Sequence, residues 1–293
     1  MLRLITSIRS FISAWRDDPA EEGTRLGQRY VVQEVLGEGS YGITYKCLDQ
    51  TVAKTVAVKQ ARPSKGSYAV KLLLQEAEII KMLQHQGIPA FIDFFREKGN
   101  SYLVMSYMEG DTLEDLIFGQ GVQYQEIQTV QMTLQLLDLV EYVHRQGYVH
   151  LDLRIPNVLF NEGRLLLIDF GLARRLGEEP LPRSSLFSRR TTESRSSAGK
   201  KANEHSDLYD IGHFMLFMLY STYEAPETTT SLDLHMSQTE RSWQEELGLS
   251  DDLKLIIERL FGIEEPYHSS EELREALNQF VSIKKSLCCR GRV

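Results

Sequence analysis

The pattern of apolar residues changes once along this 293-residue chain, and this change limits the fold more than any other feature. From Tyr30 to Met105 the sequence holds short runs typical of β-strands, interrupted by one helical stretch at Val70 to Leu83. Beyond Gly110 helical periodicity dominates. The expected fold class is α+β, with a small β-rich lobe joined through Ser106 to Gly110 to a larger helical lobe. Ligands tend to bind between such lobes.

The predicted elements define the domain organisation. Strands are expected at Tyr30 to Leu36, Gly42 to Leu48, Thr55 to Gln60, Ala90 to Phe95 and Tyr102 to Met105. Beyond the connector, helices are expected at Thr112 to Phe118, Glu126 to Arg145, Asp207 to Tyr220, Asp251 to Phe261 and Ser270 to Lys284. We therefore assign residues 28–108 to the small lobe, 109–284 to the large lobe and 285–293 to a basic tail.

The first 27 residues precede the strand-rich region. Residues 1–16 place apolar side chains at helical spacing, with three arginines and no acidic residue. This pattern predicts a basic amphipathic helix that either packs on its own domain or makes weak contact with an anionic membrane. Residues 17–27 are rich in acids and glycine and are interpreted as a linker.

Charge, cysteine content and hydropathy exclude several classes of function. A net charge of -8 disfavours binding to nucleic acid, so no such partner is expected. The three cysteines, Cys47, Cys288 and Cys289, have the spacing of neither a disulfide framework nor a zinc site. The longest apolar stretch, Ile211 to Tyr220, is far shorter than the roughly 20 residues of a membrane span. A soluble, cytoplasmic protein, at most peripheral at the membrane, is expected.

A glycine-rich string lies between the first two predicted strands. Gly37-Glu-Gly-Ser-Tyr-Gly42 fits the pattern G-x-G-x-x-G, in which backbone N–H groups approach phosphate oxygens without a Cβ in the way. Because the sequence after Gly42 continues as a strand, a hairpin is favoured over the strand-to-helix turn of a dinucleotide-binding fold. The candidate nucleotide contacts in this string are Gly37, Glu38, Gly39, Ser40 and Gly42.

A lysine follows at the end of the next strand, in Thr55-Val-Ala-Val-Lys59. With the glycine string before it, this lysine makes the sequence resemble the protein kinases, which implies a protein-kinase-like two-lobed fold. The resemblance further implies that Lys59 holds the α- and β-phosphates of ATP and that Ala57 belongs to the nucleotide-binding set. Glu76, on the following helix, fits the partner of Lys59 better than Glu78 does.

Two later motifs match the catalytic part of the same family. His150-Leu-Asp-Leu-Arg-Ile-Pro-Asn157 follows the pattern H-R-D-L-x-x-x-N except at Leu151, and Asp169-Phe-Gly171 follows an apolar strand. Phosphoryl transfer needs a carboxylate to orient the attacking hydroxyl and ligands to hold Mg²⁺. The implied catalytic residues are Lys59, Asp152 and Arg154, and the implied ligands of Mg²⁺ or Mn²⁺ are Asn157 and Asp169.

The connector between the lobes, Tyr102 to Gly110, resembles the kinase segment that meets adenine. The resemblance places Met105 where it limits the depth of the nucleotide pocket. Met108 is expected to offer backbone hydrogen bonds to adenine.

The chain departs from the kinase pattern around its substrate-docking region. No Ala-Pro-Glu precedes Asp207, and Pro266 stands where the arginine that pairs with that glutamate would be. Removing both halves of a buried ion pair can be close to neutral, so the region is expected to be rebuilt rather than damaged. The function expected is an ATP- and Mg²⁺-dependent serine/threonine protein kinase. Two alternatives stay open: a pseudokinase scaffold that binds nucleotide or a partner protein, and a kinase of a small molecule or lipid.

Overall fold

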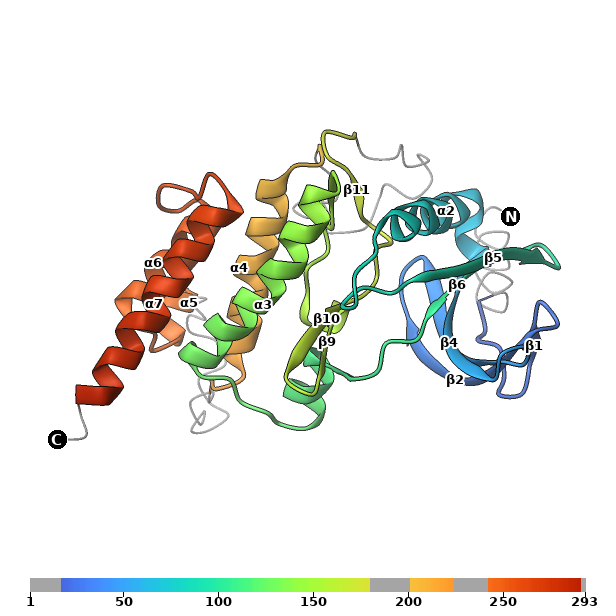
Figure 1. The fold of residues 1–293 in the computed structure, drawn as a ribbon, viewed down its shortest axis with the longest axis horizontal. Coiled ribbons are helices and arrows are strands. Elements are labelled where there is room, and N and C mark those ends of the chain that lie inside the picture. The colour runs from blue at the N-terminus through green and yellow to red at the C-terminus, as the bar shows by residue number, and fades with distance from the viewer. Residues whose placement is uncertain (1–16, 180–200, 224–241, 291–293) are drawn as a thin grey trace, which may run out of the picture.

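A computed structural model describes residues 17–179, 201–223 and 242–290 of the chain. These residues form a small lobe with one curled sheet and one long helix, and a larger lobe that is mainly helical (Figure 1). The two-lobed α+β expectation is confirmed. The helix predicted over residues 1–16 lies outside the described residues.

Six antiparallel strands build the sheet of the small lobe, in the order β1-β2-β3-β4-β6-β5. They are β1 (Arg25–Leu26), β2 (Tyr30–Glu38), β3 (Gly42–Asp49), β4 (Lys54–Ala61), β5 (Phe91–Glu97) and β6 (Asn100–Ser106). All five predicted strands are present, with ends shifted by one or two residues. The alternation of apolar and polar residues was therefore a sufficient guide to this sheet.

The interpretation of residues 17–27 as a linker was wrong. β1 pairs with the start of β2, and Leu26 is buried in the apolar cluster of the sheet. Asp17 accepts a hydrogen bond from the Ser64 backbone N–H at 3.0 Å, so this segment packs on the small lobe at both ends. A strand of two residues is too short to produce a periodic pattern, which is why composition misled here.

One long helix, α2 (Gly66–Met82), follows a 3₁₀ turn, η1 (Pro63–Lys65), and packs against β4, β5 and β6 (Figure 1). Its buried residues recur at helical spacing: Ala69, Leu72, Leu73, Glu76, Ala77, Ile79 and Ile80. Glu76 is the one acidic residue on this apolar face. A buried carboxylate needs a partner, which indicates where a site begins.

The large lobe is built around two long helices that lie side by side, α3 (Glu126–Arg145) and α4 (Glu204–Tyr220) (Figure 1). The remaining helices are α5 (Trp243–Glu246), α6 (Asp251–Phe261) and α7 (Ser270–Arg290). The bounds of α3 and α6 agree with those predicted. α7 continues to Arg290, so residues 285–290 belong to a helix and not to a separate tail. No proline or glycine interrupts the sequence before Gly291, which explains the longer helix.

The helix predicted at Thr112 to Phe118 is only partly present. Thr112 belongs to β7 (Asp111–Thr112), and a π-helical turn, η2 (Asp115–Gly119), follows. The Thr112 hydroxyl donates to Asp115 at 2.6 Å and accepts from the Asp115 backbone N–H at 2.9 Å. These side-chain bonds compete with helical pairing and turn the chain at this point.

Short strands position the loops between the long helices. β7, β9 (Val158–Asn161) and β10 (Arg164–Leu167) form one small sheet, and β8 (Tyr148–Val149) pairs with β11 (Arg174–Arg175) in another. A 3₁₀ turn, η3 (Ile155–Asn157), connects β8 to β9. Both sheets hold the segments that carry the kinase-like motifs.

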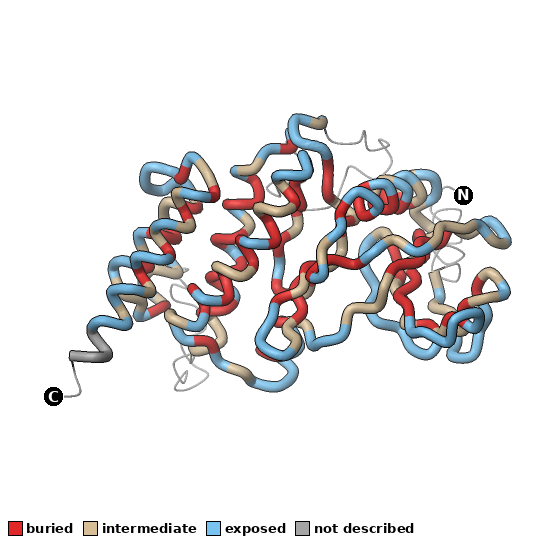
Figure 2. The backbone as a smooth tube through the Cα atoms, viewed as in Figure 1, coloured by how far each residue is buried: buried red, intermediate tan, exposed pale blue. Residues whose placement is uncertain are grey.

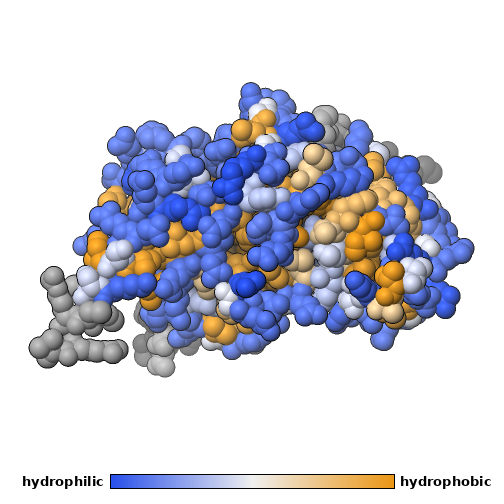
Figure 3. Space-filling model, viewed as in Figure 1, coloured by the Kyte–Doolittle hydropathy of each residue, from blue (hydrophilic) through white to orange (hydrophobic). Residues whose placement is uncertain are grey.

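One apolar core runs through both lobes. It joins buried residues of α2 and β6 to those of α3, α4, α6 and α7, while a second cluster fills the outer side of the small sheet (Figure 2). On the face drawn in Figure 3, hydrophilic residues cover most of the surface, and apolar ones are visible along the middle of the molecule and over the small lobe. Among the described residues, no helix is long and apolar enough to cross a membrane.

Candidate active site

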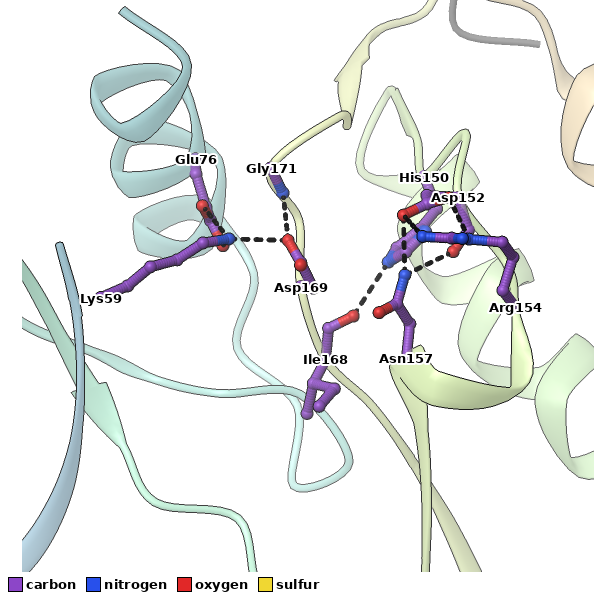
Figure 4. A network of polar contacts seen from close by, with 9 residues as sticks. All are labelled: Lys59, Glu76, His150, Asp152, Arg154, Asn157, Ile168, Asp169 and Gly171. Atoms are coloured by element: carbon purple, nitrogen blue, oxygen red, sulfur yellow. Dashed lines mark hydrogen bonds and ion pairs between the residues drawn. The ribbon is translucent and has the colours of Figure 1, made fainter. Parts of the chain in front are cut away.

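A lysine shared by two carboxylates joins the small lobe to the large one. Lys59, on β4, places its Nζ 2.7 Å from Glu76 Oε2 and 2.7 Å from Asp169 Oδ1 (Figure 4). Glu76 comes from α2 and is only 2% exposed, whereas Asp169 comes from the large lobe and is about half-exposed. Glu78, the alternative partner of Lys59, pairs with Lys81 on the exposed side of α2 instead.

Burial and mutual charge set the pKa values of these three groups in different directions. Burial disfavours the charged form of Lys59, but the carboxylates of Asp169 and Glu76 outweigh it and raise the lysine pKa. Burial raises the pKa of Glu76 to about 7 despite the lysine. For Asp169 burial is outweighed by Lys59, which lowers the pKa to about 2. Asp169 is therefore a carboxylate at neutral pH, available to a cation.

Asp152 lies on the other side of the site from Lys59, Glu76 and Asp169, and neighbouring side chains hold it in place (Figure 4). Asn157 Nδ2 donates to the Asp152 backbone carbonyl at 2.9 Å and to its Oδ2 at 2.8 Å. Arg154 Nε lies 2.6 Å from Asp152 Oδ1, so this guanidinium neutralises the carboxylate. The Arg154 side chain is more than half exposed, and a bound phosphate can compete for it.

Asp169 is held in an uncommon backbone conformation. Its φ is 61°, and its Oδ1 accepts the Gly171 backbone N–H at 3.0 Å. Phe170, which follows, is buried with its ring edge against His150 at a centroid distance of 4.8 Å. The ring of His150 also reaches the Ile168 carbonyl at 3.3 Å. A non-glycine residue at positive φ persists only where its surroundings fix it, and these contacts do so.

Asp207, predicted only as the start of a helix, also takes part in the site. Its side chain is fully buried, and it accepts the backbone N–H groups of His150 at 2.9 Å and Leu151 at 2.7 Å. Leu151 has φ 64° and is buried against Val149 and Ala202. The strained turn before Asp152 is thus fixed from α4. An acid in the first turn of an apolar helix was the available signal.

The glycine string forms the predicted hairpin. β2 pairs with β3 as far as Glu38 and Ile43, and the turn closes with a bond from Gly39 N–H to the Gly42 carbonyl at 2.9 Å. A Cβ on Gly42 would approach the Gln60 carbonyl and Lys59 to 3.2 Å, whereas one on Gly37 would meet nothing within 4 Å. Gly42 is thus required for the close approach of β3 to β4. Its open neighbours leave backbone free to face a ligand.

Two of the residues expected to line the adenine pocket lie on adjacent strands, and a third lies in the connector. Ala57 on β4 is the register partner of Met105 on β6, and both are buried. Thr44 on β3 is in turn the register partner of Lys59. Met108 lies in the connector, where its sulfur accepts the Ser106 hydroxyl at 3.7 Å.

The metal ligands implied by the sequence suit a hard cation. Because Asn157 donates through Nδ2, its Oδ1 acts as an acceptor, and Figure 4 shows it turned away from Asp152 toward the side of Asp169. Mg²⁺ prefers such oxygens and usually completes its shell with phosphates and water. Among the described residues no group of three or more His, Cys, Asp or Glu could hold a metal alone. The donor set fits an ion that arrives with a phosphorylated ligand.

Known proteins resemble this chain over most of its length. Residues 30–282 match the family model described as "Protein kinase domain". "Probable serine/threonine-protein kinase YbdM" of Bacillus subtilis (strain 168) is 34% identical over 267 residues, which cover 90% of this chain and 94% of that protein. "Cyclin-dependent kinase D-1" of Oryza sativa subsp. japonica is 36% identical over 155 residues, covering 52% of this chain and 36% of that protein.

A solved structure supports the fold independently. The kinase domain of PknI from Mycobacterium tuberculosis aligns with a TM-score of 0.64 at 17% identity, covering 89% of this chain and 99% of that chain. At this identity the likeness concerns the fold alone. With a family model that matches most of the chain and a relative similar over nearly its whole length, this protein belongs to the protein kinase family, beside members of the serine/threonine type.

Proposed function

We propose that this protein transfers the γ-phosphoryl group of ATP, in the presence of Mg²⁺, to serine or threonine hydroxyls of a protein substrate. The observation that carries this proposal is the pairing of Lys59 with both Glu76 and Asp169, opposite the Asp152–Asn157 pair. These charges come from two lobes and are brought together by direct ion pairs and hydrogen bonds. The names of two bacterial relatives, both "Probable serine/threonine-protein kinase", support the serine/threonine preference.

Each residue has a distinct part in the proposed reaction. Asp152 accepts the proton of the substrate hydroxyl, whose oxygen bonds to the γ-phosphorus while the bond from phosphorus to the bridging oxygen breaks and ADP leaves. Lys59 neutralises the α- and β-phosphates, and Arg154 offers a second positive charge near Asp152. Asp169 and Asn157 would hold Mg²⁺, which would supply charge neutralisation on the phosphates when bound.

The proposal predicts different losses for the two aspartates. Asp169→Ala should abolish Mg²⁺-dependent turnover because it removes the carboxylate that holds the ion. Asp152→Ala should still bind ATP with unchanged affinity but lose transfer by about a hundredfold or more. The measurement is phosphate incorporation from radiolabelled ATP into candidate proteins, alongside nucleotide binding by calorimetry. The exposed Asp251→Ala on α6 is the matched control.

The same assay separates the alternative functions. Nucleotide binding without any transfer by the unsubstituted protein would favour a pseudokinase scaffold. Label found in a small molecule or lipid, and not in protein, would favour the third function. Wild-type-like turnover in either aspartate variant would contradict the site assignment itself.

The location of the protein is a separate proposal that rests on its sequence. We infer a cytoplasmic protein in which the basic residues 1–16, outside the described structure, make weak contact with anionic membrane. Each basic residue near such a surface contributes about 1 kcal/mol, so salt should weaken binding. Sedimentation with phosphatidylserine liposomes should pull down the full chain more than a chain that starts at Asp17. Equal sedimentation would exclude this role.

A further inference from the structure

Arg62 lies directly after β4, three residues beyond Lys59, and its guanidinium reaches the glycine hairpin. Its Nε donates to the Gly39 carbonyl at 2.6 Å, and one terminal nitrogen donates to Glu38 Oε2 at 3.0 Å. The backbone N–H of Arg62 also donates to the Tyr41 carbonyl at 2.8 Å. Three residues of the hairpin tip, Glu38, Gly39 and Tyr41, are therefore tied to one arginine.

The glycines of the hairpin tip have little packing of their own, whereas Tyr41 beside them packs against Tyr68. A Cβ built on Gly37 meets nothing within 4 Å, and one on Gly39 meets only the Gly42 carbonyl at 3.6 Å. Glu38 is about half-exposed, whereas the Arg62 side chain is 16% exposed. A glycine-rich backbone loses much conformational freedom when it is fixed, so hydrogen bonds from an ordered donor matter more here than in a packed strand.

Arg62 is itself oriented by the segment that precedes β1. Asp17 Oδ2 lies 3.6 Å from the other terminal nitrogen of Arg62, and Asp17 Oδ1 accepts the Ser64 backbone N–H at 3.0 Å. Both side chains are mostly buried, at 16% and 14% exposure. The guanidinium thus makes two hydrogen bonds to the hairpin tip and an ion pair with Asp17, a set that a lysine ammonium on a flexible stem does not reproduce.

We propose that Arg62 is a positioning residue that holds the glycine hairpin where its backbone meets the nucleotide phosphates, and that Asp17 acts through Arg62. The inference rests on the proposed function, since it takes the hairpin as the phosphate-binding element. Arg62 has no contact with substrate in this role. Its effect should fall on the phosphates and spare the adenosine part, which is expected against β4, β6 and the connector.

The test compares two ligands that differ only in phosphate. Arg62→Ala should raise the Kd of Mg²⁺–ADP about tenfold, the effect of losing one charged hydrogen bond, and leave the Kd of adenosine within about twofold. Arg62→Lys should show most of the same rise in the Kd of Mg²⁺–ADP. Lysine keeps the positive charge, but it lacks the planar guanidinium that donates to both Gly39 and Glu38. Arg96→Ala, an exposed arginine on edge strand β5, is the matched control and should change neither constant.

A double-mutant cycle tests the part of Asp17. Asp17→Asn should weaken ADP binding less than Arg62→Ala does, and should add nothing once Arg62 is alanine. Additive effects would show that Asp17 acts on its own and would overturn that half of the proposal.

Hydrogen exchange measures the hairpin without any ligand. In Arg62→Ala the amides of residues 38–42 should exchange about fivefold faster or more, while those of α3 keep their rates. Unchanged exchange, or equal losses of ADP and adenosine affinity, would overturn the inference and leave the proposed function intact. An unsubstituted protein that binds neither ligand would overturn the proposed function, and the exchange rates would still decide whether Arg62 holds the hairpin.

Discussion

Glu76 differs from the other charged residues of the site because its ionisation opposes folding. Its pKa is raised to about 7 by burial, above the ordinary value of 4.5, so the folded protein binds more protons than the unfolded chain between these pH values. Stability from this group therefore increases as pH falls from 7 toward 4.5. Above pH 7 the buried carboxylate lowers the free energy of unfolding and is kept for its contact with Lys59.

The raised pKa of Glu76 predicts that Glu76→Gln gains thermal stability above pH 7 while it loses activity. At pH 8 the variant should melt about 2 to 5 °C above the unsubstituted protein, since the neutral amide avoids the burial of a charge. At pH 5, where Glu76 is already protonated, the two melting temperatures should converge. Phosphotransfer should fall at least about tenfold because Lys59 loses its orienting partner.

Glu78→Gln, on the exposed face of the same helix, is the control for that experiment. Thermal melting across pH and initial rates at pH 8 provide the measurement. A melting temperature that drops at pH 8 would show that the ion pair with Lys59 outweighs burial and would reverse the sign.

At the scale of elements, the first turn of α4 fixes the loop that carries Asp152. Asp207 satisfies two buried backbone N–H groups, those of His150 and Leu151, and also meets His144 Nε2 at 2.8 Å. The positive φ of Leu151 is supported by the hydrogen bond from its backbone N–H to this carboxylate. Helix and loop are therefore one structural unit, although 56 residues separate Leu151 from Asp207.

Asp207→Ala should lower the free energy of unfolding by about 2 to 5 kcal/mol, because two buried donors lose a charged acceptor. Transfer should fall further than nucleotide affinity, since the loop of Asp152 is displaced while the small lobe is untouched. Urea denaturation and parallel ADP titration measure the two effects. Asp251→Ala, an acid in the first turn of α6, should cost about 1 kcal/mol or less. A comparable loss in both variants would refute the special role of Asp207.

Elements with a strong periodic pattern were predictable, and those made by distant pairing were not. α3 begins and ends at the predicted residues because its apolar face repeats over 20 residues. β8 and β11 have two residues each, and only their mutual pairing makes them strands. Among site residues, the motifs of Lys59 and Asp169 were identifiable from order and spacing. The roles of Asp207 and Arg62 depend on contacts across the fold that a single sequence does not show.

For the whole molecule, the continuous core implies that a weakness in one lobe is felt as a loss of global stability. The turn Glu265 to Ser269, where the family's arginine is replaced by Pro266, shows how the far end of the large lobe is held instead. Arg259 from α6 donates to the Glu265 carbonyl at 2.8 Å, pairs with Glu272 and lies over the Tyr267 ring at 4.0 Å. This arginine ties α6 to the turn and to the first turn of α7.

Substitutions of Arg259 and Arg62 should therefore have different effects. The first should lower stability, whereas the second should weaken ADP binding. Arg259→Met should lower the free energy of unfolding by about 1 to 3 kcal/mol, through loss of charged hydrogen bonds and a cation–π contact that are partly exposed. Because α6 lies in the lobe opposite the glycine hairpin, the Kd of ADP should stay within about twofold. Arg164→Met, at the exposed start of β10, is the control and should shift stability by less than about 0.5 kcal/mol.

Urea denaturation followed by circular dichroism should show one transition for each variant. Separate transitions for the two lobes would contradict a continuous core that couples them. An ADP defect in Arg259→Met as large as that of Arg62→Ala would show that stability and nucleotide binding are coupled through the core and cannot be assigned to separate arginines.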